Sequence, residues 1–563
     1  MVQVTRFLLI ASLLVLLSCT VQAQSSDIRV SKWTYLTSDF IDSSPALGEG
    51  MVFIGSADGF VYALDQTTGL EEWRFQTGDF VQSTPSYSGG LVFVGSDDFN
   101  VYALNASNGE MVWSYNVSGK VRSSPKVVGG VVYVGSSNQN LYAFSASDGE
   151  YLWSYPTGGE IYSSPAIYAG MAYIGSNDGK LYAINITDGS FAWSYQTDGA
   201  VYSSPDVVNN IVYFGSSDNS VYAVNAASGT LNWTFESSGQ IIASPEVSSG
   251  ILWVGSLDSK MYALNSFTGA LLWSYEAGAE IQSSPYYSEK TKLVYFGCND
   301  NKLYALDSVT GKMVWWFTAD DWVTSKPVVF GPRIYFGSYD GRVYCLSTIV
   351  SFISSPLDGA TVTGATLRIQ GQSYADAGVS LVEIKIGADP VWRTVVGTES
   401  WSYTWGISGV SPGSYLISVR TTDDSGEMEP EPYKQISVTV LKEIVVDKPM
   451  TVEFPQSAEE DTTVDVVVKD ENGGPVPFAK LTTLGGKVYY GDENGVISGV
   501  LVESEDGELE FTVTKSGYYV ANQNRLAIKV QQPDYTLYIV GAGIIVVGGV
   551  IVYVWKKRSE PGY

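Results

Sequence analysis

The chain has 563 residues, of which 45% are hydrophobic and 13% aromatic, so it is too long for one ordinary core and too apolar to be disordered. Its formal net charge of −27 opposes binding to nucleic acid or to anionic lipid. The sequence contains no histidine, which excludes Ser-His-Asp triads, His-paired cysteine nucleophiles and imidazole sites for haem or metal. Several β-rich domains are therefore expected, and nucleic acid is not an expected partner.

The N-terminal segment is typical of a secretory signal peptide. A basic start precedes the apolar run Phe7–Leu17, and small residues end at Ala23, so residues 1–23 are predicted to be removed. The tetrapeptide LLSC ending at Cys19 offers an alternative, because it resembles a bacterial lipobox with the cysteine as a lipid attachment site. Either interpretation places the mature chain outside the cytoplasm.

An internal repeat dominates residues 31–347. Tryptophan recurs eight times, with six spacings of 40 residues and a last one of 42, and proline and tyrosine recur with the same period. The tryptophans are Trp33, Trp73, Trp113, Trp153, Trp193, Trp233, Trp273 and Trp315. Each unit contains four short apolar or alternating runs separated by turn signals such as Asn177-Asp178-Gly179, which predicts a four-stranded antiparallel sheet. A four-strand repeat of this length is typical of a β-propeller blade, so an eight-bladed β-propeller is expected.

The phase of the repeat predicts how the ring closes. The series begins with a fourth strand around Trp33 and ends with a third strand around Tyr344. The last blade is therefore expected to take its fourth strand from the N-terminus, which leaves few open edges. The recurring proline lacks a backbone donor, so it fits an edge strand, here the innermost one.

The lines "ALDQTTGLEEW", "AINITDGSFAW" and "ALDSVTGKMVW" resemble the A-x-D-x-x-T-G-x-x-x-W pattern of the pyrroloquinoline-quinone (PQQ) repeat family, over Ser31 to Ser347. That family includes dehydrogenases that hold PQQ and calcium at the propeller axis. It also includes a non-enzymatic branch, with the propeller lipoprotein of the bacterial barrel-assembly machinery and archaeal surface proteins. The resemblance implies that the eight tryptophans dock one blade against the next. The dehydrogenases carry adjacent cysteines that this chain lacks, so we expect no catalytic, cofactor-binding or metal-binding residues.

Function is expected where the repeats differ. The residue three before each recurring proline is expected to surround one mouth of the channel, and it varies: Asp42, Gln82, Arg122, Tyr162, Tyr202, Ile242, Gln282 and Thr324. Arg122, Tyr162 and Tyr202 form an aromatic and cationic patch of the kind enriched in binding surfaces, and Trp316 and Trp322 are a second candidate. Ordinary variation of solvent-facing residues is the alternative interpretation.

Three other groups of residues have structural interpretations. A recurring turn acid, as at Asp58 and Asp178, is expected to cap its own hairpin, with metal binding as the alternative. Cys298 and Cys345 replace small residues of the repeat and are expected to be buried thiols, with a disulfide as the alternative. Four Asn-x-Ser/Thr sequons, candidates for N-glycosylation, occur at Asn105, Asn116, Asn185 and Asn232.

Two further domains and a membrane anchor are expected after the repeats. Alternating strands over residues 351–442 resemble immunoglobulin-like (Ig-like) sandwiches of prokaryotic surface proteins. Residues 445–532 resemble the carboxypeptidase-regulatory or transthyretin-like sandwich. The uncharged run 537–555 is long enough for a transmembrane helix, and the cationic tail 556–563 is expected to remain in the cytoplasm.

These expectations favour a non-catalytic binding or scaffold protein on the outer face of a prokaryotic, expected archaeal, cell membrane. Its partner is expected to be a protein or an envelope glycan. One alternative is a membrane-anchored quinoprotein dehydrogenase with PQQ and calcium, and a second is a purely structural envelope component. The oligomeric state is not predicted.

Overall fold

The computed structural model of this protein consists of β-strands, turns and loops. It describes residues 31–441 and, beyond them, residues 449–453, 463–470, 472–483, 487–501, 511–514, 519–520, 529–532, 535–539, 551–552 and 554–557. No helix occurs among these residues, so the all-β prediction is confirmed for the described part of the chain. The predicted signal peptide, residues 1–23, lies outside it.

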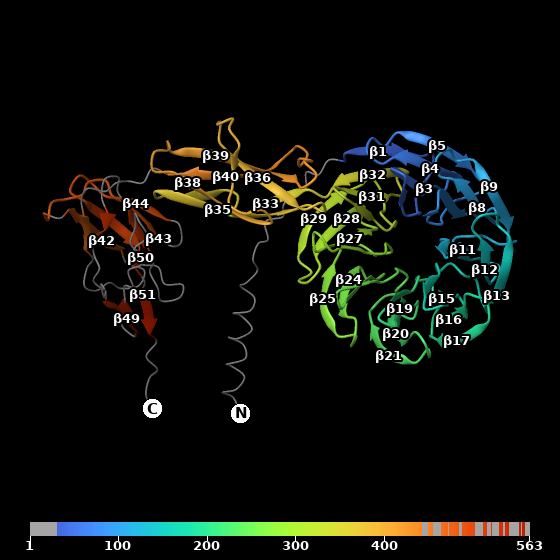
Figure 1. The fold of residues 1–563 in the computed structure, drawn as a ribbon. Coiled ribbons are helices and arrows are strands. Elements are labelled where there is room, and N and C mark those ends of the chain that lie inside the picture. Colours follow the sequence, from blue (N-terminus) through green and yellow to red (C-terminus); the bar gives the residue numbers. More distant parts are fainter. Residues whose placement is uncertain are drawn as a thin grey trace, which may run out of the picture. The chain divides into compact units, whose positions relative to one another are not determined.

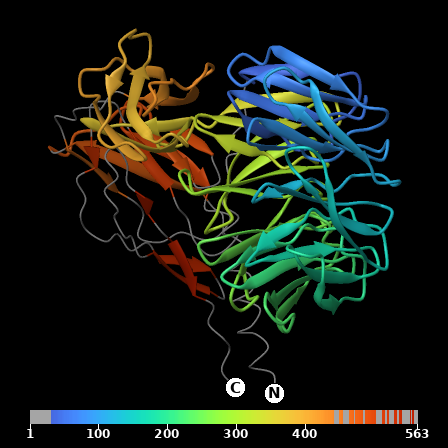
Figure 2. The same cartoon turned by 45° about the vertical axis from the view of Figure 1, so that its right-hand side comes forward.

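Residues Trp33–Ser347 form four-stranded antiparallel sheets, eight in all, that follow one another around a ring (Figure 1). Figure 2 shows the same ring from a direction turned by 45°. The second and third strands of each sheet are almost entirely buried, whereas the outermost strand alternates between buried and exposed side chains. The repeating units therefore bury their faces against one another, as a propeller requires.

Each sheet has an innermost, a second, a third and an outermost strand. The innermost strands are β2 (Ala46–Gly48), β6 (Ser86–Ser88), β10 (Lys126–Val128), β14 (Ala166–Tyr168), β18 (Asp206–Val208), β22 (Glu246–Ser248), β26 (Tyr286–Ser288) and β30 (Val328–Phe330). The second strands are β3 (Met51–Gly55), β7 (Leu91–Gly95), β11 (Val131–Gly135), β15 (Met171–Gly175), β19 (Ile211–Gly215), β23 (Ile251–Gly255), β27 (Leu293–Cys298) and β31 (Arg333–Gly337). The third strands are β4 (Phe60–Asp65), β8 (Asn100–Asn105), β12 (Asn140–Ser145), β16 (Lys180–Asn185), β20 (Ser220–Asn225), β24 (Lys260–Asn265), β28 (Lys302–Asp307) and β32 (Arg342–Ser347). The outermost strands are β1 (Trp33–Leu36), β5 (Glu71–Gln76), β9 (Met111–Asn116), β13 (Tyr151–Pro156), β17 (Phe191–Gln196), β21 (Leu231–Glu236), β25 (Leu271–Glu276) and β29 (Met313–Thr318).

The N-terminal strand closes the ring. β1 pairs antiparallel with β32, and Trp33 lies opposite Cys345 just as Trp73 lies opposite Ala63 within a continuous sheet. The sheet order β1-β32-β31-β30 thus joins the two ends of the repeat region, as the phase of the repeat predicts. The entropic cost of joining distant segments rises only logarithmically with their separation, so the hydrogen bonds between β1 and β32 can offset it.

The recurring tryptophans lie in the seams between neighbouring sheets. Trp73 Nε1 donates a hydrogen bond of 2.8 Å to the carbonyl of Ala106 in the next sheet, and its ring covers Gly109. A Cβ atom at Gly109 would lie 2.6 Å from the Trp73 ring, and the φ angle of +72° also requires glycine. The same indole donation joins Trp33 to Gln66, Trp113 to Ala146, Trp153 to Ile186, Trp193 to Ala226, Trp233 to Ser266 and Trp273 to Ser308. Trp315, the eighth, is buried.

The turn acids cap their hairpins. Asp58 accepts the backbone N–H of Phe60 at 3.0 Å and the hydroxyl of Tyr62 at 2.7 Å. The tyrosine hydroxyl donates in the same way in the pairs Asp178 and Tyr182, Asp218 and Tyr222, Asp258 and Tyr262, Asp300 and Tyr304, and Asp340 and Tyr344. The turn-capping prediction is confirmed where the carboxylate also accepts a backbone N–H of its own hairpin, as at Asp178, Asp218, Asp258 and Asp340. Asp300 differs, because its Oδ1 has no hydrogen-bond partner among the described residues.

The two described cysteines are buried thiols. Cys298 and Cys345 are both free, so the alternative of a disulfide is wrong. Burial in an apolar environment raises the pKa of each thiol to about 12. Both therefore act as small packing residues, as the repeat pattern predicts.

Residues 350–440 form a separate set of strands. They are β33 (Val350–Ser355), β34 (Ala360–Val362), β35 (Thr366–Tyr374), β36 (Val379–Ile386), β37 (Arg393–Thr394), β38 (Ser400–Gly406), β39 (Gly413–Asp423) and β40 (Lys434–Val440). β33 pairs with β35, and β36 pairs with β37 and β39, all antiparallel. Burial alternates along these strands around a core that includes Ile384, Trp401 and Val419. Such alternation is typical of a sandwich with one face packed and one face solvated.

The C-terminal described residues are also strands. They are β41 (Pro449–Glu453), β42 (Thr463–Asp470), β43 (Lys480–Thr483), β44 (Val488–Tyr490), β45 (Val496–Leu501), β46 (Phe511–Thr514), β47 (Tyr519–Val520), β48 (Lys529–Gln532), β49 (Tyr535–Ile539), β50 (Ile551–Val552) and β51 (Val554–Lys557). Two four-stranded sheets have the orders β45-β42-β41-β47 and β44-β43-β46-β50.

The expected transmembrane helix over residues 537–555 is not formed in the described residues. Both ends of that run are strands, in β49, β50 and β51, whereas residues 540–550 and 553 lie outside the described part. Valine, isoleucine and tyrosine dominate those ends, and such side chains favour extended backbone. Among the described residues no helix has the length and apolar character needed to span a membrane.

Candidate functional site

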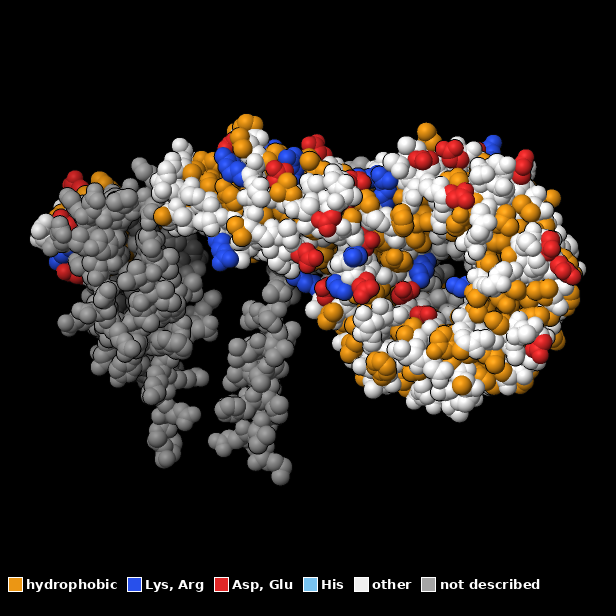
Figure 3. All heavy atoms as spheres, in the orientation of Figure 1, with side chains coloured by type: hydrophobic (Ala, Val, Ile, Leu, Met, Phe, Trp, Pro, Cys, Tyr) orange, Lys and Arg blue, Asp and Glu red, His pale blue; other side chains and the backbone are white. Residues whose placement is uncertain are grey.

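The ring of sheets leaves a central opening, around which Lys and Arg side chains lie together with Asp and Glu side chains (Figure 3). Successive side chains of an extended segment point to opposite sides. Before β2, Ile41, Ser43 and Pro45 are buried, whereas Asp42 and Ser44 are partly exposed. In most sheets the residue three before the recurring proline is likewise more exposed than its two neighbours, and Tyr202 is the most exposed of the column, whereas Thr324 is buried.

Two further columns of residues lie at the same end of the opening, which we call the mouth. The first, two residues before the Asp42 column, is Phe40, Phe80, Lys120, Glu160, Ala200, Gln240, Glu280 and Trp322. The second, in the turn after each second strand, is Ala57, Asp97, Ser137, Asn177, Ser217, Leu257, Asn299 and Tyr339. In every sheet the backbone N–H of the second column donates to the carbonyl of the first, at 2.8–3.0 Å. One scaffold thus presents variable side chains around the mouth.

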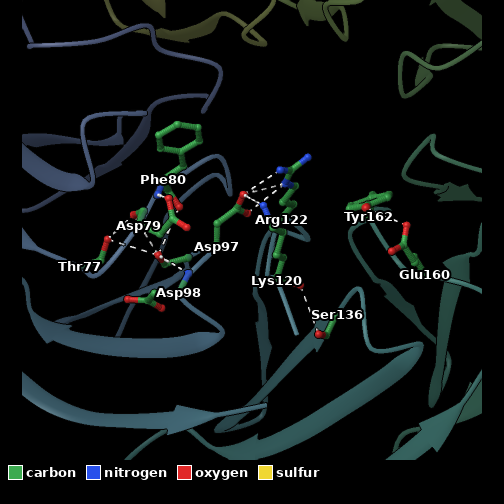
Figure 4. A network of polar contacts seen from close by, with 11 residues as sticks. Thr77, Asp79, Phe80, Asp97, Asp98, Lys120, Arg122, Ser136, Glu160 and Tyr162 are labelled. Carbon is green, nitrogen blue, oxygen red and sulfur yellow. Dashed lines mark hydrogen bonds and ion pairs between the residues drawn. The ribbon is translucent and has the colours of Figure 1, made fainter. Parts of the chain in front are cut away.

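Asp97 binds the two cations of the neighbouring sheet. Arg122 donates to both its carboxylate oxygens, through Nε at 2.9 Å and Nη2 at 2.7 Å, and Lys120 Nζ lies at 2.8 Å (Figure 4). Burial raises the pKa of Asp97, but the hydrogen bonds from Arg122 and Lys120 outweigh it and hold the pKa below its ordinary value. The Asp97 side chain is 1% exposed, so its negative charge depends on these partners.

Arg122 also contacts an aromatic stack. Its guanidinium carbon lies 5.7 Å from the ring centre of Tyr162, which stacks on Tyr202 with centroids 6.1 Å apart and an interplanar angle of 27°. Tyr162 donates its hydroxyl to Glu160 at 2.8 Å, and burial together with this carboxylate raises the tyrosine pKa to about 12. The structure therefore brings together Arg122, Tyr162 and Tyr202, which come from three successive sheets. We call them the tyrosine stack.

A second aromatic group, the aromatic arc, continues the mouth in the other direction. Trp322 meets Tyr339 edge-to-face at 5.7 Å, Tyr339 lies 4.7 Å from Phe40, and Phe40 lies 6.1 Å from Phe80. These four residues cross the seam at which the ring closes. Phe80 connects the aromatic arc to the tyrosine stack through Asp97. The Phe80 carbonyl accepts the backbone N–H of Asp97, and the Asp97 carboxylate binds Arg122 of the stack.

The seam of ring closure also carries a partly buried acid. Asp42 accepts a hydrogen bond of 2.8 Å from the Thr324 hydroxyl, and Tyr339 is a second hydrogen-bonding neighbour. Burial raises the pKa of Asp42, and these hydrogen bonds offset only part of the increase. The column that the sequence singled out therefore includes a structural contact between the first and last sheets.

Below the mouth, a ring of hydroxyl groups lines the opening. The members are Ser44, Thr84, Ser124, Ser164, Ser204, Ser244 and Ser284, each of which accepts a backbone N–H from the preceding sheet. Lys326 occupies the eighth position and pairs with Glu246 at 2.7 Å. The hydroxyls hold neighbouring innermost strands together, and only Lys326 breaks the pattern.

The remaining candidate residues lie elsewhere. Trp316 is in β29, an outermost strand, and packs against the buried cluster around Trp273, so the structure does not bring it to the mouth. Two of the sequon asparagines are turn caps, since Asn105 accepts the N–H of Ser107 and Asn185 that of Thr187. The other two, Asn116 and Asn232, have exposed side chains on outermost strands.

Several mouth residues were not singled out from the sequence. Asp97, Lys120, Phe40, Phe80 and Tyr339 belong to columns that the repeat alignment contains but whose position at the mouth it does not reveal. The sequence does contain a signal for two of them. The residue immediately after the Gly-Ser or Gly-Cys pair at the end of the second strand varies from repeat to repeat, and this column contains Asp97 and Tyr339.

The described residues therefore define a β-propeller of four-stranded repeats, followed by sandwich-type β-sheets. Residues 3–251 match a family model described as the β-propeller of the beta-alanine-activating enzyme. Residues 288–349 match the model of outer membrane protein assembly factor BamB, and residues 350–419 match that of a bacterial Ig domain. No curated protein matches the sequence.

Solved structures of low sequence identity share this fold. BamB from Moraxella catarrhalis has a TM-score of 0.50 at 17% identity, covering 57% of this chain and all of that one. The computationally designed Ika8 protein has a TM-score of 0.51 at 18% identity, covering 55% of this chain and 97% of that one. A europium-containing methanol dehydrogenase has a TM-score of 0.50 at 14% identity, with coverages of 56% and 93%. The same fold thus occurs in an assembly factor, a designed protein and a dehydrogenase. The fold alone therefore does not identify a function, which has to be argued from the residues of the mouth.

Proposed function

We propose that this chain is a non-catalytic binding protein that presents an eight-bladed PQQ-like propeller and captures a protein or an envelope glycan at the mouth. The observation that carries the proposal is the tyrosine stack, in which Asp97 fixes Arg122 against Tyr162. Pre-organised aromatic and arginine side chains, partly exposed on a rigid scaffold, are the groups that dominate binding surfaces. The match to the BamB model supports a role in protein interaction.

We also propose that the protein acts at the cell surface. The sequence of residues 1–23 supports export, and the apolar run 537–555 followed by Lys556 and Lys557 supports attachment to a membrane. Extraction of membranes at high pH, followed by protease treatment of intact cells, tests this placement.

The competing assignment is a quinoprotein dehydrogenase. PQQ is a tricarboxylate, so a site for it needs cations that are not already paired with carboxylates of the protein. Lys120 and Arg122 share the carboxylate of Asp97, and Lys326 is paired with Glu246, so these cations are already engaged within the protein, which supports the binding assignment. Saturable uptake of PQQ with calcium, or a chromophore in the purified protein, would overturn the binding assignment.

A photo-crosslinking amino acid at position 202 tests the proposal on intact cells. Tyr202 is 39% exposed at the mouth, and Tyr151 is 45% exposed on the outermost strand β13, which makes it a matched control. We expect a defined adduct from position 202 and none from position 151. Identical adduct patterns at the two positions, or none at either, would contradict a binding function of the mouth.

A further inference from the structure

We infer that the mouth binds a neutral polysaccharide, recognised over several sugar units; this inference rests on the proposed binding function. Two observations carry it: exposed aromatic rings at three places around the mouth, and charges that are largely paired within the mouth.

The aromatic rings provide apolar faces at intervals around the mouth. Phe80, Tyr202 and Trp322 are 38%, 39% and 46% exposed, although burial of such side chains is favourable. Their contacts through Tyr339, Phe40 and Tyr162 hold them in place, so little conformational entropy is lost on binding. A pyranose ring has apolar C–H faces that match such rings, and a chain of sugars presents these faces repeatedly.

The charges of the mouth select against an anionic ligand. Asp97 is shared by Arg122 and Lys120, and Glu160 accepts the Tyr162 hydroxyl and an amide hydrogen of Asn177. These four charged groups sum to zero, and the other acids of the mouth columns, Asp42 and Glu280, add only negative charge. A polyanion would therefore meet no complementary potential here.

Binding of defined oligosaccharides to the purified full-length chain tests the inference. The probes are maltohexaose, cellohexaose, chitohexaose and mannohexaose, with oligogalacturonate as an anionic control and a polyproline peptide as a peptide control. We expect a saturable change in tryptophan fluorescence with at least one neutral probe. Tyr202→Ala or Trp322→Ala should each weaken that binding about tenfold, the loss expected for one aromatic contact.

Tyr151→Ala is the matched control and should change binding less than about twofold, whereas Tyr202→Phe, which keeps the ring, should bind like the wild type. Failure of all four neutral probes, or equal losses in Tyr202→Ala and Tyr151→Ala, overturns the inference. Binding of the polyproline peptide alone, lost in Tyr202→Ala, overturns the carbohydrate assignment but leaves the proposed function. Failure of every probe, together with identical crosslinks from positions 202 and 151, overturns both.

Discussion

The seams between the sheets and the mouth of the channel use the same kinds of side chain for different purposes. In a seam, Trp73 is 7% exposed and lies against Gly109, and six other tryptophans of the repeated column show the same arrangement. At the mouth, Trp322 is 46% exposed and has no tryptophan at the equivalent position of any other sheet. The difference shows that repetition follows the demands of close packing, whereas solvent-facing positions on the same scaffold are free to vary and to acquire a function.

The largest expected difference between seam and mouth is the loss of stability when one tryptophan of each region is replaced by alanine. Trp73→Ala should lower the free energy of unfolding by about 3–5 kcal/mol, because it leaves a cavity and deprives the Ala106 carbonyl of its donor. Trp322→Ala should change it by less than about 0.5 kcal/mol, as is usual for an exposed side chain. Urea denaturation of the full chain, followed by fluorescence, measures both. Similar losses in the two variants would remove the distinction between seam and mouth.

A glycine substitution sharpens the same comparison with a smaller expected effect. Gly109→Ala places a methyl group 2.6 Å from the Trp73 ring at a φ angle of +72°, and strain and overpacking together should cost about 2–4 kcal/mol. Gly129→Ala is the matched control, since its φ angle is +61° but no atom lies within 4 Å of the added methyl group. It should cost about 1 kcal/mol, the conformational part alone. Equal midpoints in thermal unfolding for the two variants would show that the seam is not closely packed.

The charged part of the mouth should be distinguished by pH. Asp97→Asn should lower the free energy of unfolding at pH 7 by about 1–2 kcal/mol, because Arg122 and Lys120 lose a charged acceptor but stay partly hydrated. The folded-state pKa of Asp97 is depressed, so its stabilisation is present above the ordinary carboxyl pKa of about 4 and is lost as the pH falls through the lower, folded-state value. The gap between wild type and variant should therefore close in acid. A gap that stays constant from pH 7 to acid would mean that the Asp97 charge is not involved.

Much of the fold could be predicted because its information is local and repeated. The turn signals, the alternating strands and the phase of the tryptophans led to four-stranded sheets and to closure through β1. The C-terminal run was harder, because a stretch rich in valine and isoleucine satisfies the hydropathy of a membrane helix and also favours extended backbone.

The mouth could be predicted only in part. Arg122, Tyr162 and Tyr202 were accessible to sequence reasoning, because they vary at one fixed distance from the recurring proline. Trp316 and Trp322 are predicted as a second candidate because both lie outside the repeated tryptophan column, but the strand register puts Trp316 on the outermost strand, opposite Tyr304.

By itself, the sequence determined the strand pattern, the closure of the ring and the positions that must stay constant, since these depend on short-range periodicity and on one repeated contact. Only the tertiary structure decided which variable residues meet. Asp97 and Arg122 are 25 positions apart and belong to different sheets, and Phe40 and Tyr339 come from opposite ends of the repeat region. Their contacts depend on how neighbouring sheets are placed around the ring, a property that no single repeat contains.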